Sequence, residues 1–185
     1  MGFSLVAQAL LVSYLPEADW TPLISKFGYS VGFLIVILGR QQLFTENTLT
    51  PVLQLLKKKN LEVLRNVGRL WTIVLFANIV GAFLFAWGIA SFNIFEPDVY
   101  KEFNAIAVKM VEHNFSITFF SAIFAGWLIA LIIWLLPFAE TARVGVIILV
   151  TYVIGLAHFP HIIAGSVAAL YGVFTGGHGL MEFVG

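Results

Sequence analysis

Two histidines flank a proline within an apolar stretch near the carboxyl end of the chain. His158, Pro160 and His161 interrupt residues 144–174. Proline removes a backbone donor and disfavours helix at the residue before it, so a helix break is predicted near 158–161. Histidine titrates near neutral pH and can offer a proton or a hydrogen bond. The two histidines lie one helical turn apart, but neither a carboxylate nor a third ligand accompanies them, so no metal site is predicted.

A polar run, GRQQLFTENTLTP at 39–51, lies between the apolar segments 27–38 and 52–56. Its arginine, Arg40, would cost several kcal/mol at membrane depth if it were unpaired. Two interpretations follow: Arg40 pairs with Glu46 or Glu140 and fixes the loop, or it supplies positive potential for anions. We favour the pairing.

Both interruptions have a chemical consequence. Helices that restart near Thr48–Pro51 and Ile162 present positive amino-terminal ends, which attract anions. Irregular backbone at membrane depth is tolerated only where protein or water surrounds it. The two breaks therefore predict a polar pathway at the membrane midplane.

The amino-acid composition is that of a membrane protein, whose surroundings are lipid. Of 185 residues, 60% are hydrophobic and 11% are charged, whereas soluble domains are about 45–50% apolar. The formal net charge is zero and cysteine is absent, which removes the usual signals of nucleic-acid binding, disulfides and thiolate metal sites. No paired carboxylates or Ser/His couple indicate an enzyme, and no cofactor is predicted.

We predict one all-α polytopic transmembrane domain over residues 1–185. Its segments are a partial span 1 at 2–15, span 2 at 27–44 with a break at 45–51, an interfacial amphipathic helix at 60–69, span 3 at 70–95, a loop at 96–112, span 4 at 115–138, and span 5 at 144–174. The run at 2–15 is open to two interpretations, a signal peptide or the back half of a first span. It has no basic residue before it, which favours the second interpretation.

The interrupted second and fifth spans lie three spans apart. This spacing is typical of an inverted repeat in which spans one to three mirror spans four to six, with binding at the midplane. On that pattern, the front of the first helix and the whole sixth helix are expected to be missing from this chain.

Several motifs resemble the formate/nitrite transporter family over nearly the whole chain. They are Leu43-Phe44-Thr45, the third-span run Asn78-Ile79-Val80-Gly81-Ala82, and the histidine at the fifth-span break. GRQQLFTENTLTP and AHFPHIIAG resemble a less-studied bacterial inner-membrane branch of that family. The resemblance implies an aquaporin-like fold with six spans per protomer, and a homopentamer in which each protomer has its own pore.

The resemblance also implies roles for individual residues. Thr45 and His161 would face each other at the pore centre, between two hydrophobic constrictions. The positions at or near those constrictions are Tyr29, Phe33, Leu43, Phe44 and Ile154. This chain departs from better-known members at Met110 and Gly126, where they carry a lysine and an asparagine.

The predicted function is a channel or transporter for small monovalent weak-acid anions, with protons and the lipid bilayer as its other partners. An anion in an apolar constriction loses its solvation, and His161 would act as a proton or hydrogen-bond donor. The plainer interpretation makes His161 a packing residue bonded to a carbonyl, and His158 a residue that supports packing or the loop. Met110, Gly126 and Arg40 motivate an alternative function, a channel-fold scaffold or regulator that does not conduct.

Overall fold

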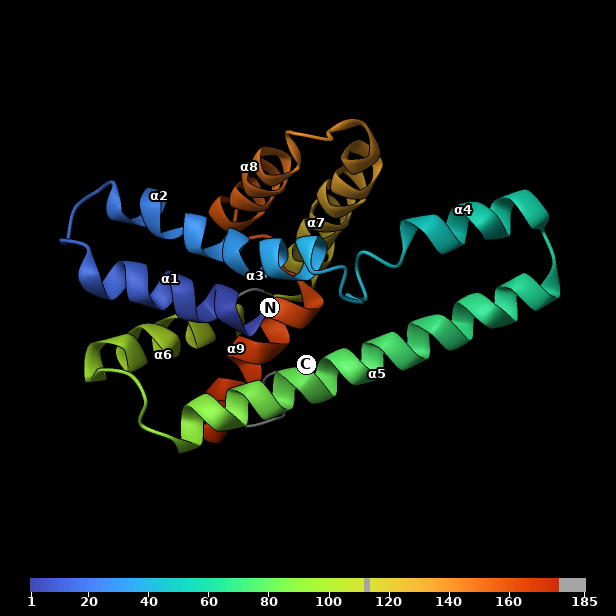
Figure 1. Cartoon of the computed structure of the whole chain (residues 1–185). Helices are drawn as coiled ribbons and strands as arrows, with labels where there is room; N and C mark the ends of the chain where they lie inside the picture. Colours follow the sequence, from blue (N-terminus) through green and yellow to red (C-terminus); the bar gives the residue numbers. More distant parts are fainter. Residues whose placement is uncertain (112–113, 177–185) are drawn as a thin grey trace.

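The computed structural model describes residues 1–111 and 114–176, and this part of the chain is helical and contains no strand. Figure 1 shows the arrangement of its helices. They are α1 (Gly2–Tyr14), α2 (Thr21–Ser25), α3 (Phe27–Leu38), α4 (Leu49–Lys58), α5 (Leu61–Ser91), α6 (Pro97–Val111), α7 (Phe115–Leu135), the 3-10 turn η1 (Leu136–Phe138), α8 (Arg143–Leu156) and α9 (Ile162–Phe174).

Three helical segments among the described residues are long and apolar enough to cross a bilayer. They are Thr21–Leu38, Leu61–Ser91 and Phe115–Phe138. The last of these has aromatic and aliphatic side chains on most of its surface, and many of them are exposed. A helix that is apolar all round is stable when lipid is its solvent. The chain is therefore a multi-pass membrane protein.

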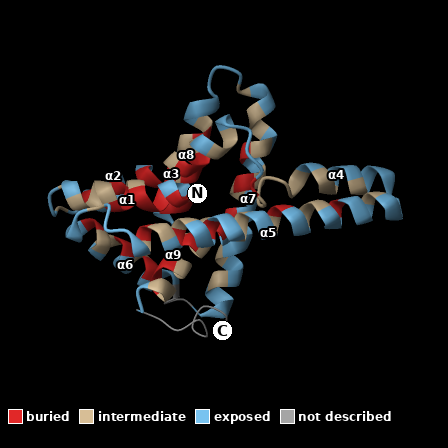
Figure 2. Cartoon of the chain, turned by 60° about the horizontal axis from the view of Figure 1, so that its bottom comes forward, coloured by how far each residue is buried: buried red, intermediate tan, exposed pale blue. Residues whose placement is uncertain are grey.

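The predicted interfacial helix at 60–69 and the predicted span at 70–95 form one continuous helix, α5. Asn60 caps its start by accepting a hydrogen bond from the Glu62 N–H at 2.9 Å. No proline interrupts its 31 residues, which at 1.5 Å each reach about 46 Å, longer than the roughly 30 Å hydrocarbon core. Figure 1 shows α4 and the first half of α5 as an arm beside the bundle, and Figure 2 shows that this arm is mostly exposed or half-buried.

The predicted loop at 96–112 is wrong, because Pro97–Val111 forms helix α6. Val99, Phe103 and Ala107 are buried, and their spacing of four places them on one helical face. Charged residues made this segment resemble a loop, but they lie on the remaining surface, where Lys101 pairs with Asp98 at 2.7 Å. Residue 112 of the predicted loop lies outside the described residues.

Two apolar clusters hold the bundle together, and α9 contributes to both. The first joins α1, α5, α6 and α9 through side chains such as Leu5, Ala86, Phe103 and Tyr171. The second joins α3, α7, α8 and α9, and its buried members are Tyr29, Phe33, Leu43, Ile129, Ile132, Ile147, Val150, Ile154 and Ile163. The start of α9 therefore lies where the two clusters meet.

Helix α3 ends at Leu38, before the predicted end of span 2 at residue 44. Arg40 takes a left-handed conformation with φ 51°. The Arg40 N–H donates to the carbonyl of Ile37 at 3.2 Å, and the Gln41 N–H donates to the carbonyl of Val36 at 2.9 Å. These two bonds form a Schellman cap, which satisfies the last carbonyls and stops the helix.

Helix α8 ends in the same way. His158 has φ 54°, its N–H donates to the Gly155 carbonyl at 3.3 Å, and the Phe159 N–H donates to the Ile154 carbonyl at 3.1 Å. Each half-helix therefore ends in a Schellman cap whose left-handed residue is not glycine. After these caps, the chain restarts as α4 at Leu49 and as α9 at Ile162.

Candidate functional site

His161 is buried at the amino terminus of α9. Its side chain is the N-cap: Nδ1 accepts a hydrogen bond from the Ala164 N–H at 3.2 Å. The residue is 5% exposed, so the ring has almost no contact with solvent. The cap fixes the position of the imidazole relative to the start of the half-helix.

Thr45 lies opposite His161, in the loop between α3 and α4. Its Oγ1 atom is 2.8 Å from Nε2 of His161. Because Nδ1 accepts a bond from a backbone N–H, its lone pair is occupied and the neutral ring carries its hydrogen on Nε2. The Nε2–H group therefore donates to the Thr45 hydroxyl. This contact joins residues 116 positions apart and brings together the two breaks.

Helix α5 holds the Thr45 loop in place. The Asn78 side chain binds the loop backbone twice: its Oδ1 accepts from the Phe44 N–H at 2.9 Å, and its Nδ2 donates to the Gln42 carbonyl at 3.0 Å. Trp71, two turns earlier on α5, donates its indole N–H to the Asn47 carbonyl at 2.9 Å. The backbone groups of this loop have no partners within a helix of their own. Side chains of the adjacent transmembrane helix α5 supply the hydrogen bonds instead.

Apolar side chains surround the His161–Thr45 pair. The ring of Phe33 meets the imidazole edge-on at 5.1 Å between centroids, and Tyr29 lies 5.3 Å from Phe33. Four of the five residues predicted at constrictions, Tyr29, Phe33, Leu43 and Ile154, belong to the second apolar cluster and are 0–9% exposed. The fifth, Phe44, is half-buried and packs against that cluster while meeting Trp71 edge-on.

Two cavities lead toward His161 from one side. The larger has a volume of about 370 Å³ and is lined by residues of α1, α2, α3, α6 and α8. A smaller cavity of about 40 Å³ is lined by His161 itself, and both cavities share Gln8, Tyr29, Met110 and Phe159. The larger cavity is therefore a vestibule whose inner end lies beside the buried histidine.

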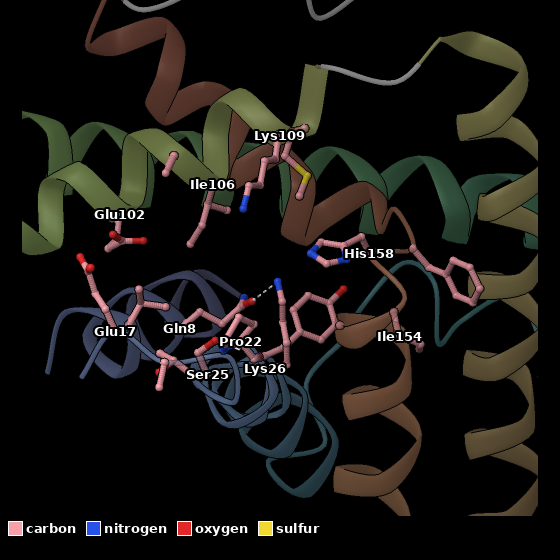
Figure 3. A pocket seen from close by; sticks show the side chains of 18 residues that line it. Gln8, Glu17, Pro22, Ser25, Lys26, Glu102, Ile106, Lys109, Ile154 and His158 are labelled. Carbon is pink, nitrogen blue, oxygen red and sulfur yellow. Dashed lines mark hydrogen bonds between the residues drawn. The ribbon is translucent and has the colours of Figure 1, made fainter. Parts of the chain in front are cut away.

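Charged side chains line this first vestibule. Figure 3 shows Lys26 and Lys109 pointing into it from opposite walls, with Glu17 and Glu102 at the end away from His158. The Lys26 ammonium donates to Oε1 of Gln8 at 3.4 Å. Two cations thus lie between the carboxylates and the apolar centre, an order that attracts an anion inward.

Arg40 and Glu46, which were also predicted as site residues, do not form the expected ion pair. Among the described residues, the structure contains one ion pair, Lys101–Asp98, so Arg40 pairs with neither Glu46 nor Glu140. The favoured pairing of Arg40 was therefore wrong. Oε1 of Glu46 is buried and has no hydrogen-bond partner.

Met110 and Gly126, the two positions at which this chain departs from better-known members of the family, lie in different surroundings. Met110 lines the first vestibule, next to Lys109. Gly126 lies on the exposed face of α7, and a Cβ built there would meet nothing within 4 Å. His158 lines the first vestibule as well as terminating α8.

Sequence reasoning assigned no role to Asn78, Lys26 or Gln8. Asn78 carried a signal, since an amide within an apolar span needs a partner, but nothing along the chain identified the loop as that partner. Gln8 lies in α1 and Lys26 between α2 and α3, and only the packing of these elements brings the two residues to one cavity.

Comparisons with known proteins identify the family of the chain. The family model described as formate/nitrite transporter matches residues 1–185. The inner membrane protein YfdC of Escherichia coli is 40% identical over 176 residues, covering 95% of this chain and 57% of that protein. The formate channel BtFdhC of Bacillus thuringiensis is 31% identical over 141 residues, covering 73% of this chain and 52% of that channel.

A solved structure shares the fold. A pentameric formate channel with formate bound superimposes with a TM-score of 0.80 at 21% identity, covering 98% of this chain and 74% of that chain. The all-helical class and the channel fold predicted from the sequence are thus confirmed, and the family is one of transporters rather than enzymes. The chain spans a little over half the length of the two curated relatives. From the match along its whole length, the chain belongs to the formate/nitrite transporter family.

Proposed function

We propose that the complete protein conducts small monovalent weak-acid anions such as formate or nitrite, with His161 and Thr45 at the centre of the path. The observation that carries the proposal is the 2.8 Å contact between Nε2 of His161 and the Thr45 hydroxyl, surrounded by apolar side chains. The family match and the formate channel among the relatives support the class of substrate.

The hydroxyl of Thr45 offers the donor that an anion needs. It accepts a hydrogen bond from His161, and its own hydrogen has no acceptor among the described residues. A hydroxyl that accepts from one group is polarised and donates more strongly to the next. An anion that has lost its water in the constriction would therefore receive a hydrogen bond from Thr45, which offsets part of its desolvation cost.

The N-cap favours hydrogen-bond donation over proton transfer. A protonated imidazole would carry hydrogens on both nitrogens, so the bond from the Ala164 N–H to Nδ1 would be lost. It would also place a positive charge at the positive end of α9. Both effects stabilise the neutral ring, which can donate from Nε2 without giving up its proton.

The relatives support the setting of this proposal. The relative from Escherichia coli is named an inner membrane protein, and the solved structure that shares the fold is a pentameric formate channel. We accordingly place the protein in the bacterial inner membrane as a homopentamer in which each protomer has its own path. Five copies in one bilayer would cover the apolar surface that a single chain exposes.

The experiment is anion flux into proteoliposomes that contain the complete protein, with empty liposomes subtracted. We expect formate or nitrite flux in the wild type and at least a tenfold loss in His161→Ala. His161→Asn should retain part of the flux, because asparagine is a good N-cap and its amide can donate to Thr45. Equal flux from the wild type and His161→Ala would refute the role of the histidine.

Two further outcomes separate the alternatives. Wild-type flux no greater than that of empty liposomes would refute conduction and favour the non-conducting scaffold. Protein-dependent flux that rises tenfold per pH unit on acidification would favour proton transfer over hydrogen-bond donation, because one proton would then cross with each anion.

A further inference from the structure

Arg40 and His158 share an unusual backbone conformation. Their φ angles are 51° and 54°, in the left-handed region where glycine is the usual residue at a helix end. An ordinary side chain there costs about 1–2 kcal/mol. The two positions are equivalent within the two Schellman caps, so both half-helices tolerate the same strain. Lys59 at the end of α4 shares the conformation, with φ 46°, so the backbone alone assigns no role. What distinguishes Arg40 and His158 is that each lines a cavity.

The two caps lie at opposite ends of a helix pair. Helices α3 and α8 pack together, and the Thr151 hydroxyl of α8 donates to the Ser30 hydroxyl of α3 at 2.8 Å. Tyr29 near the start of α3 and Ile154 near the end of α8 line the first vestibule. A different cavity is lined by Ile37 at the end of α3 and by Arg143 at the start of α8. The pair is therefore antiparallel, with one cavity at each end.

The second cavity has a distinct chemistry. Its volume is about 470 Å³, and its lining combines two arginines, Arg40 and Arg143, with the apolar residues Ile37, Leu38, Ile133, Leu136 and Pro137. No carboxylate belongs to this lining, and within the described part of the chain neither arginine forms an ion pair. We name this cavity the arginine vestibule.

The arginine vestibule borders the apolar constriction. Ile37 and Leu136, which line it, pack against the cluster that contains Phe33 and Leu43. Phe33 in turn meets the ring of His161. From one end of α3 to the other, the order is the lysine-lined vestibule, the histidine within its apolar surroundings, and the arginine vestibule.

We propose that Arg40 and Arg143 form a second anion-collecting mouth, on the side of the constriction opposite Lys26 and Lys109. Its ligand is a small monovalent carboxylate or nitrite, held transiently by charge-assisted hydrogen bonds from the two guanidinium groups. This inference rests on the proposed function and adds to it the group that collects substrate on the second side.

The decisive variant is Arg40→Gly, because glycine is the better residue for the cap. If Arg40 only ended the helix, glycine would leave flux unchanged and keep or raise the thermal unfolding temperature. If Arg40 collects anions, the same variant is expected to keep that stability but lose flux at low substrate concentration. Arg40→Lys retains the charge in the same strained backbone and should restore most of the flux.

The assay is initial formate uptake by proteoliposomes of neutral lipid, at a concentration well below half-saturation and again at saturation. Arg40→Gly and Arg143→Gln are each expected to reduce low-concentration uptake several-fold. The double variant should reduce it about tenfold, the lower end of the effect of charge-focused clefts on association. Saturated uptake should change little, and added potassium gluconate should reduce the difference from wild type by screening. Lys57→Gln, on the exposed arm, is the matched control and should match wild type.

Several results would overturn this inference. Equal low-concentration uptake by the double variant and the wild type would remove the collecting role, while wild-type flux would leave the proposed function intact. An equal loss of uptake at low and at saturating formate would show that the arginines maintain the structure of the path and do not collect anions. An effect that appears only when phosphatidylglycerol is present would assign the vestibule to an anionic lipid headgroup, which offers the same charge to the guanidinium groups.

Discussion

Replacing Asn78 by leucine tests whether α5 holds the Thr45 loop in place. Leucine has nearly the shape of asparagine, so the variant removes two hydrogen bonds, at 2.9 and 3.0 Å, and leaves little cavity. At about 1 kcal/mol for each bond, the loop should lose about 2 kcal/mol, which is roughly 30-fold in its closed-to-open equilibrium. The Thr45 hydroxyl would then spend less time bonded to its histidine partner, so anion flux should also change.

Hydrogen exchange measured by mass spectrometry on the purified protein reports this effect directly. The Phe44 amide, which donates to Asn78, should exchange about 30-fold faster in Asn78→Leu, in line with the lost free energy. Asn66→Leu is the matched control, since Asn66 is exposed on the same helix. Unchanged exchange across residues 43–47 in Asn78→Leu, with the assembly still folded, would refute the idea that this amide holds the loop.

Three further predictions concern the centre and the packing of the bundle. Thr45→Val keeps the volume but removes the hydroxyl that accepts from the buried imidazole. We expect at least a tenfold loss of formate flux and a loss of stability of about 1–3 kcal/mol, and Thr50→Val on the exposed face of α4 should match wild type in both measurements. Gly28→Ala places a Cβ 2.6 Å from the backbone nitrogen of a residue in α1. The overpacking should lower stability by about 1–3 kcal/mol in denaturant titrations. As the control, Gly81→Ala meets nothing within 4 Å and should be neutral or slightly stabilising. Phe103→Ala empties a fully buried site on α6 and should cost about 3–5 kcal/mol in the same titration; a loss below 1 kcal/mol would show that α6 is not part of the core.

The sequence predicted most of what depends on local pattern. Pro160 and the polar run after Leu38 placed irregular backbone in two apolar stretches, and the similarity to a known family paired Thr45 with His161. The structure brings those two side chains to hydrogen-bonding distance. Periodicity alone could not have identified this pair, because the residues lie 116 positions apart.

The features that the sequence did not predict depend on which face of a helix is buried and on which side chains come into contact. Helix α6 was missed because its charged residues were given more weight than the buried stripe at Val99, Phe103 and Ala107. Arg40 was expected to find a carboxylate, since an unpaired charge is costly in lipid. In the structure, its backbone ends helix α3 and the residue lines a cavity, an arrangement that depends on how the helices pack.

The capped imidazole has an electrical consequence. If anions are conducted as proposed and His161 donates a hydrogen bond while keeping its proton, the residue is unchanged after each anion passes, and one full negative charge would cross the bilayer per transport event. Each 100 mV of membrane potential then contributes about 2.3 kcal/mol, which corresponds to roughly a 50-fold concentration ratio. In a cell whose interior is negative, such a path would carry acid anions outward even against a moderate gradient, and its activity would be recorded as a current.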